Sequence, residues 1–174
     1  MKRSKMYTRS EIKTASAPTQ IEYAIETGEI MDCLMGNGCY NRKGTDAALS
    51  TCCIDTGRFI YGLNYLYEDG TIQPEDAERM FIELMQKDGA GLLVAMKYIT
   101  EYFSFKTHYP EDISLSLDTE RLKKVASEQY IKFEEDLSRI TRIDQIGLRG
   151  NVKHELLNIN GFLRSYYGFD IIGQ

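Results

Sequence analysis

The sequence predicts an all-α fold, a single compact domain of about six helices with one short extended segment near residues 106–117. Three observations support this prediction. Apolar residues recur every three to four positions in six segments, which is the period of a helix with one buried face. Turns that contain glycine or proline separate these segments. The hydrophobic content of 43% in 174 residues is enough for one core of ordinary size.

The first three predicted helices occupy the N-terminal half of the chain. The first runs over residues 17–35, with Pro18 in its first turn, and the sequence Gly36-Asn37-Gly38 ends it. The second runs from Thr45 or Asp46 toward Tyr67. The third begins at Pro74 and ends before Asp88-Gly89, with acidic residues in its first turn, where they favour the helix dipole.

The remaining predicted helices follow a central one over residues 90–105, which is apolar on most sides. In the segment 106–117 apolar and serine residues alternate from position 113 onward, which is typical of extended chain. Asp118 or Thr119 caps a fifth helix that reaches Ile140. A break at Gly147–Gly150 separates it from a sixth helix, which is capped by Asn151 and ends before Gly168.

The charge is uneven along the chain. Residues 1–15 carry five basic residues and one acidic residue, lack an apolar period, and are expected to be a flexible basic arm on a helical domain of residues 16–174. Residues 16–119 carry seven basic and seventeen acidic residues, which disfavours a protein that coats nucleic acid over its whole surface. The N-terminus lacks the apolar stretch of a signal peptide, so we expect a cytoplasmic protein with no membrane association.

The four cysteines follow the pattern C-x5-C-x12-C-C between positions 33 and 53. Structural zinc sites normally use pairs of cysteines two to four residues apart. The adjacent Cys52 and Cys53 lie on a predicted helix, about 100° apart, and would not chelate one ion together. We therefore expect four reduced, metal-free thiols and no cofactor, with structural zinc as the alternative.

A glycine-containing loop with Arg42 and Lys43 precedes the second predicted helix. The exposed amides of that helix start would attract an anion. However, Lys43 precedes Gly44, whereas the phosphate-binding loop of nucleotide-binding proteins has its lysine after the second glycine and follows a strand. An ordinary interhelical loop is therefore the favoured interpretation. His108 and His154 show no metal-binding spacing and are expected at the surface.

Four carboxylates lie on one face of the predicted helix over residues 22–32, and these are Glu22, Glu26, Glu29 and Asp32. If a second acidic helix, such as residues 75–83, faced them, the two sets of carboxylates would bind a divalent metal ion. The protein would then be a small helical metal-dependent hydrolase. A solvated acidic face explains the same pattern more simply.

The basic residues Arg142, Arg149 and Lys153 surround the predicted break between the last two helices. A glycine turn followed by a capped helix with basic residues is the outline of a degenerate helix-turn-helix near residues 140–165, which would read DNA. Ile143 occupies a position where a small residue normally permits the helices to cross closely. A plain helical hairpin is therefore favoured.

The favoured function is a non-enzymatic helical protein-interaction module, which would act as an adaptor, inhibitor or assembly component by binding a partner protein. No nucleophile–base pair, cofactor loop or metal spacing is present in the sequence, and the 12 tyrosines suit contact surfaces. An acidic body suits a partner protein with a basic surface, or competes with nucleic acid for such a surface. We also expect the chain to self-associate, for example as a homodimer. A nucleic-acid-binding protein and the metal-dependent hydrolase are the alternatives.

Overall fold

The computed structural model describes residues 56–140 and 143–173, and every regular element in those residues is a helix. The helices in chain order are α6 (Thr56–Glu68), α7 (Pro74–Lys87), α8 (Gly89–His108), α9 (Thr119–Ser138) and α10 (Ile143–Tyr167). The all-α prediction is confirmed for this part of the chain. The predicted basic arm, the first predicted helix and the start of the second lie outside the described residues.

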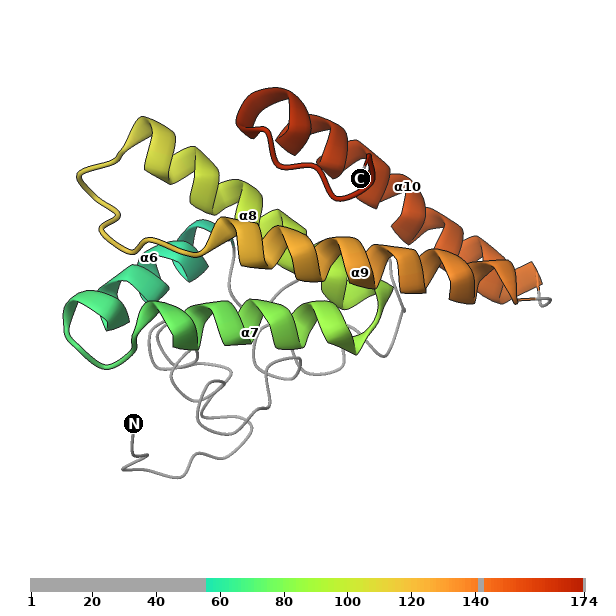
Figure 1. Cartoon of the computed structure of the whole chain (residues 1–174), viewed down its shortest axis with the longest axis horizontal. Helices are drawn as coiled ribbons and strands as arrows, with labels where there is room; N and C mark the ends of the chain where they lie inside the picture. Colours follow the sequence, from blue (N-terminus) through green and yellow to red (C-terminus); the bar gives the residue numbers. More distant parts are fainter. Residues whose placement is uncertain (1–55, 141–142, 174) are drawn as a thin grey trace.

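Helix α8 lies at the centre of the described domain and contacts each of the other four helices (Figure 1). Its residues 89–96 are buried without interruption. A helix that is apolar on all sides needs neighbours on all sides, so the predicted central position is confirmed. The helix continues past the predicted end at Phe105 to His108.

Helix α7 buries the face that its apolar period predicts, and its buried apolar residues are Ala77, Met80, Phe81, Leu84 and Met85. Asp88 ends α7 and also caps α8, because its carboxylate accepts a hydrogen bond from the backbone N–H of Gly91 at 2.9 Å. A Cβ at position 91 would lie 2.2 Å from the carbonyl oxygen of Leu84. The tight connection between the two helices therefore depends on this glycine.

The predicted break at Gly147–Gly150 is wrong, because α10 runs without interruption from Ile143 to Tyr167. The last turn of α9 is instead closed by the backbone N–H of Arg139, which donates to the carbonyl oxygen of Asp136. The connection between the two helices thus lies several residues earlier than predicted.

Packing explains why the glycines at positions 147 and 150 do not end the helix. Each costs only about 1 kcal/mol relative to alanine in a helix interior. Val152, Leu156 and Leu163 are fully buried along α10, and each such side chain contributes about 1.5–3 kcal/mol by leaving water. The burial of one continuous apolar face therefore outweighs the local preference for a turn.

The segment between α8 and α9, which we call the extended segment, is non-helical as predicted, but it forms no strand and covers residues 109–118 rather than 106–117. It begins with a turn at residues 110–112. Ile113, Leu115 and Leu117 are buried, while Ser114 and Ser116 are exposed, so the predicted alternation is confirmed. The backbone of this segment forms its hydrogen bonds with side chains of α6, α7 and α8, as described below.

The C-terminal residues fold back along α10 after Gly168, which has a φ of 68°. The backbone N–H of Phe169 donates to the carbonyl oxygen of Leu163 at 3.2 Å, and the side chains of Phe169 and Ile171 are buried. The predicted helix end at Gly168 is confirmed. None of the described helices combines the length and the apolar composition that crossing a lipid bilayer requires.

Candidate interaction surface

An aromatic and acidic surface lies where α6, the end of α8 and the following extended segment meet. The exposed fractions of its three tyrosines are 42% for Tyr61, 60% for Tyr65 and 51% for Tyr109. The ring centre of Phe105 lies 4.9 Å from that of Tyr61 and 6.3 Å from that of Tyr109. We define the Tyr61 surface as the set Tyr61, Tyr65, Glu68, Phe105, Tyr109, Glu111 and Asp112.

The period of α6 determines which of its side chains reach this surface. Tyr61, Tyr65 and Glu68 are four and three residues apart and therefore share one helix face. The opposite face carries Ile60, Leu63 and Leu66, all buried in the core. Burial of the apolar face leaves the tyrosines in solvent.

Asn64 connects α6 to the extended segment through both ends of its side-chain amide. It is only 5% exposed. Its Oδ1 accepts hydrogen bonds from the backbone N–H groups of Ser114 and Leu115, each at 3.0 Å. Its Nδ2 donates to the carbonyl oxygen of Asp112 at 3.0 Å and to the carboxylate of Glu68. One buried amide therefore holds the two elements that carry the exposed tyrosines in a defined relative position.

Two further side chains of α8 bind the same extended segment. The hydroxyl of Tyr102 donates to the carbonyl oxygen of Leu115 at 3.2 Å and accepts from the backbone N–H of Leu117 at 3.0 Å. The ammonium of Lys106 donates to the carbonyl oxygen of Ile113 at 3.1 Å. Burial is the largest cause that raises the pKa of Tyr102 above its ordinary value, so this phenol stays neutral and keeps its hydrogen.

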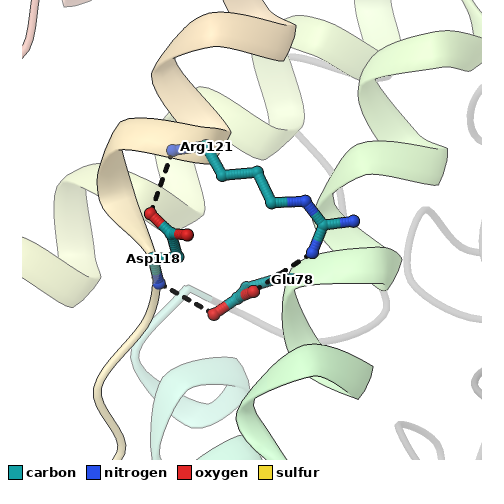
Figure 2. Close-up of polar contacts among 3 residues, drawn as sticks. All are labelled: Glu78, Asp118 and Arg121. Carbon is teal, nitrogen blue, oxygen red and sulfur yellow. Dashed lines mark hydrogen bonds and ion pairs between the residues drawn. The ribbon is translucent and has the colours of Figure 1, made fainter.

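A buried carboxylate joins α7 to the start of α9 (Figure 2). Glu78 is 5% exposed. Its Oε2 accepts from the backbone N–H of Asp118 at 2.8 Å, and its Oε1 lies 3.3 Å from the guanidinium of Arg121. The carboxylate of Asp118 in turn accepts from the backbone N–H of Arg121 at 3.1 Å. This network satisfies Glu78 and fixes the end of the extended segment, which is a structural role.

The Tyr61 surface carries three acidic residues, Glu68, Glu111 and Asp112. Glu68 and Asp112 both bond the Nδ2 of Asn64, one through its carboxylate and the other through its carbonyl oxygen. Glu111 is the exposed neighbour of Asp112. Partial burial, followed by the negative charge of Asp112, raises the pKa of the nearby Tyr61 phenol. Among the described residues, no lysine or arginine forms an ion pair with these three carboxylates.

A second aromatic cluster lies on α10 and the adjoining part of α8, and we call it the Phe162 surface: Phe103, Phe162, Tyr166 and Tyr167. Phe162 is 43% exposed and Tyr166 is 70% exposed. The rings of Phe103 and Tyr167 stack with centres 5.1 Å apart and planes at 11°. No acidic residue belongs to this cluster.

The C-terminal segment beside the Phe162 surface is held by another buried amide. Asn160 donates to the carboxylate of Asp170 at 3.0 Å and accepts from the backbone N–H of Ile171 at 2.8 Å. The same carboxylate accepts from the backbone N–H of Gly173, and this bond, followed by that from Asn160, lowers the pKa of Asp170. The arrangement fixes the chain after α10.

Of the basic residues predicted to contact DNA, only Lys153 has a described side chain. Its ammonium lies 3.1 Å from the carboxylate of Glu134 on α9. Arg142 lies outside the described residues, and for Arg149 only the helical backbone is described. The predicted basic site therefore stays a prediction. His108 and His154 are exposed, as predicted.

The predicted anion site (Arg42 and Lys43), the acidic helix over residues 22–32 and the four cysteines lie outside the described residues. The suggested second acidic helix, residues 75–83, lies in α7, and two of its carboxylates form hydrogen bonds or ion pairs within the protein. Asp76 accepts from the backbone N–H of Gln73 at 2.9 Å, and Glu78 pairs with Arg121. No group of three or more histidine, cysteine or acidic residues in the described ranges is arranged to hold a metal ion.

The Tyr61 surface was not predicted as a site from the sequence, although its tyrosines carried a signal. The spacing of Tyr61 and Tyr65 places two large rings on the polar side of an amphipathic helix. The contribution of Tyr109, Glu111 and Asp112 depends on how the extended segment folds onto α6, which the helical period does not determine.

No family model matches this chain, and neither the curated proteins nor the solved structures contain a match.

Proposed function

We propose that this chain is a non-enzymatic protein-interaction module, an adaptor, inhibitor or assembly component that binds a partner protein through the Tyr61 surface. One observation carries the proposal. Three tyrosines from two different elements are each more than 40% exposed, and the buried amide of Asn64 connects the elements on which they stand.

Tyrosine is well suited to the centre of a protein interface. Its ring supplies a large apolar area with only two side-chain torsions to immobilise, and its hydroxyl forms hydrogen bonds at the edge. A stable interface buries about 800 Å² on each partner, with a few aromatic or arginine side chains supplying most of the affinity. The Tyr61 surface supplies such aromatic side chains, and its exposed acidic residues Glu68, Glu111 and Asp112 supply polar groups for the rim.

Nucleic-acid binding near residues 140–165 is less well supported. The ammonium of Lys153 has a carboxylate partner at 3.1 Å, and α10 is continuous where a helix-turn-helix requires a turn. A mobility-shift assay over a salt series tests this alternative directly, because phosphate contacts give a steep loss of binding with salt. The hydrolase alternative depends on residues 22–32, so the described contacts add no support for it.

The proposal is tested by quantitative capture from the native cell extract with three forms of the chain: wild type, Tyr61→Ala/Tyr65→Ala and the control Tyr166→Ala. The control removes a comparably exposed tyrosine, at 70%, from the Phe162 surface. Circular dichroism first establishes that all three forms fold alike.

We expect a protein that is retained by wild type and by Tyr166→Ala and is lost from the double variant. Retention of the same proteins by all three forms would contradict the proposal, and so would the absence of any protein retained above the background of the matrix.

A further inference from the structure

The Tyr61 surface combines exposed aromatic faces with carboxylates that no described cation neutralises. Glu68 belongs to the same helix face as Tyr61 and Tyr65, and Asp112 lies close enough to raise the pKa of the Tyr61 phenol. Lys106, near the end of α8, directs its ammonium to the carbonyl oxygen of Ile113 at 3.1 Å and to the hydroxyl of Ser116 at 3.4 Å. Its charge is thus engaged with the backbone of the extended segment.

The Phe162 surface lacks this combination. Its rings pack against one another, with 4.6 Å between the centres of Phe162 and Tyr166, and nothing in the described residues indicates what covers them. The Tyr61 surface differs because its negative charge favours some classes of binding partner over others. A carboxylate-rich partner would be repelled there, and a purely apolar partner would desolvate the carboxylates without supplying a cation to pair with them.

We infer that the occupant of the Tyr61 surface is an arginine-rich, basic segment of a partner protein, an inference that rests on the function proposed above. A guanidinium stacks on the face of a tyrosine ring, attracted by the negative charge of the ring face. It also donates two parallel hydrogen bonds to one carboxylate. Tyr61, Tyr65 and Tyr109 supply the rings, and Glu68, Glu111 and Asp112 supply the carboxylates. Lysine satisfies the charge but neither the stacking nor the paired hydrogen bonds, so arginine is preferred.

The charge of the whole chain adds long-range attraction without locating the site. With 26 acidic and 21 basic residues, the chain has a formal net charge of −5, and such a field draws basic segments toward it. An experiment must therefore separate local recognition from this general attraction. Glu128 and Glu135 on α9 make this separation straightforward, because they are exposed acidic residues outside the Tyr61 surface.

The test measures binding of a fluorescent nine-residue peptide of alternating arginine and serine to the full chain, by anisotropy at physiological salt. The site variant is Glu111→Gln/Asp112→Asn, and the control is Glu128→Gln/Glu135→Gln, which removes the same two charges. A peptide with lysine at each arginine position tests the preference for guanidinium. Glu111→Gln alone serves as a second variant if the double variant unfolds.

We expect the site variant to weaken binding of the arginine peptide about tenfold, since each lost charge pair at a partly exposed site is worth a few-fold in affinity. The control should change it less than about twofold, and Tyr65→Ala should weaken it about fivefold. The lysine peptide should bind several-fold more weakly than the arginine peptide. Equal weakening by the site variant and the control would overturn the inference, because attraction to the general charge would then explain the binding.

Two further outcomes would also overturn it. In the first, the arginine peptide does not bind wild type, although the capture experiment still finds a protein that wild type retains and Tyr61→Ala/Tyr65→Ala does not. That outcome rejects the basic segment as the occupant but leaves the proposed function unaffected. If the peptide does not bind and no captured protein depends on Tyr61 and Tyr65, both proposals are rejected. The other is a sedimentation experiment in which wild type dimerises and the site variant does not, because a second copy of the chain would then be the occupant.

Discussion

Replacement of Asn64 by alanine is expected to destabilise the domain and to loosen the extended segment before any other part of it. The side chain is 5% exposed and forms three hydrogen bonds with the backbone of that segment. The variant leaves the N–H groups of Ser114 and Leu115 and the carbonyl oxygen of Asp112 without this partner.

The magnitude follows from where these three backbone groups lie. The hydrogen bond to Leu115 is buried, and an unsatisfied buried N–H costs about 1–3 kcal/mol. The bonds to Ser114 and Asp112 are part-buried. Water reaches such groups, so each costs about 0.5–1.5 kcal/mol, the net value of an ordinary hydrogen bond. Alanine recovers about 0.5 kcal/mol through its better helix propensity. We therefore expect the free energy of unfolding to fall by about 1.5–5.5 kcal/mol.

Urea denaturation followed by circular dichroism measures this change, and amide hydrogen exchange measures the local effect at Ser114 and Leu115. The matched control is Asn158→Ala, an exposed asparagine on α10, which should change the free energy of unfolding by less than about 0.5 kcal/mol. A similarly small change for Asn64→Ala, with amide exchange in the extended segment unaltered, would refute the structural role assigned to this amide.

Three other predictions test the core, the Glu78 network and one tyrosine. Gly91→Ala should lower the free energy of unfolding by about 2 kcal/mol or more, because its Cβ would lie 2.2 Å from a backbone oxygen of α7. In contrast, Gly161→Ala, with open space around its Cβ, should raise the free energy of unfolding by about 0.5–1 kcal/mol. Thermal melts measure both variants, and equal melting temperatures would contradict these expectations. Arg121→Met should lower the free energy of unfolding by about 1–2 kcal/mol, because it removes the ion-pair partner of the buried carboxylate of Glu78. The cost is moderate because the arginine side chain is 49% exposed, so that water screens the pair. Arg79→Met, which removes an exposed pair with Asp76, should cost under about 0.5 kcal/mol, and equal urea midpoints for the two variants would contradict this. Burial, followed by the nearby Glu134, raises the pKa of Tyr130 to about 12. Its contribution to stability is therefore complete below pH 10 and decreases as the pH rises from 10 to 12. Ultraviolet titration of Tyr130→Phe should show one fewer tyrosine that ionises near pH 12.

The helical period was sufficient to predict much of the fold. In α7 the helical period predicts an inward face of five apolar residues, and these are the five buried apolar residues of that helix: Ala77, Met80, Phe81, Leu84 and Met85. A single apolar face can only turn toward the core. The central position of α8 followed from its apolar composition on all sides. These are features in which the burial of apolar area dominates every competing effect.

Local turn preferences were less reliable. The glycines at positions 147 and 150 predicted a break, whereas the helix continues through both. A turn signal has a magnitude of about 1 kcal/mol per glycine, and tertiary packing exceeds it whenever a long apolar face is available. Conversely, Gly168 does end α10, with a φ of 68°, because the following residues fold back into the core and the chain must change direction there.

Polar contacts between residues far apart in the sequence could not be predicted from the sequence pattern. Asn64 and Leu115 are 51 positions apart, and Glu78 and Asp118 are 40 positions apart. Each is a polar residue on a helix that also has polar exposed residues, so its composition does not distinguish a buried hydrogen-bonding role from a solvated one. Glu78 was therefore grouped with the acidic residues of the first turns of α7, although it is buried.

The Tyr61 surface depends on these same long-range contacts, and this links stability to binding. Tyr109, Glu111 and Asp112 stand on an extended segment without a partner strand in the described residues, and its backbone is held instead by Asn64, Tyr102 and Glu78. If that segment were free, a partner would have to order it, at about 1–2 kcal/mol for the backbone of each residue. Preorganisation therefore lets the contacts of the surface contribute to affinity. It follows that Asn64→Ala should weaken both folding and partner binding, whereas Tyr65→Ala should weaken binding alone. Affinity that survives Asn64→Ala unchanged would mean that the rings of α6 bind the partner without the extended segment.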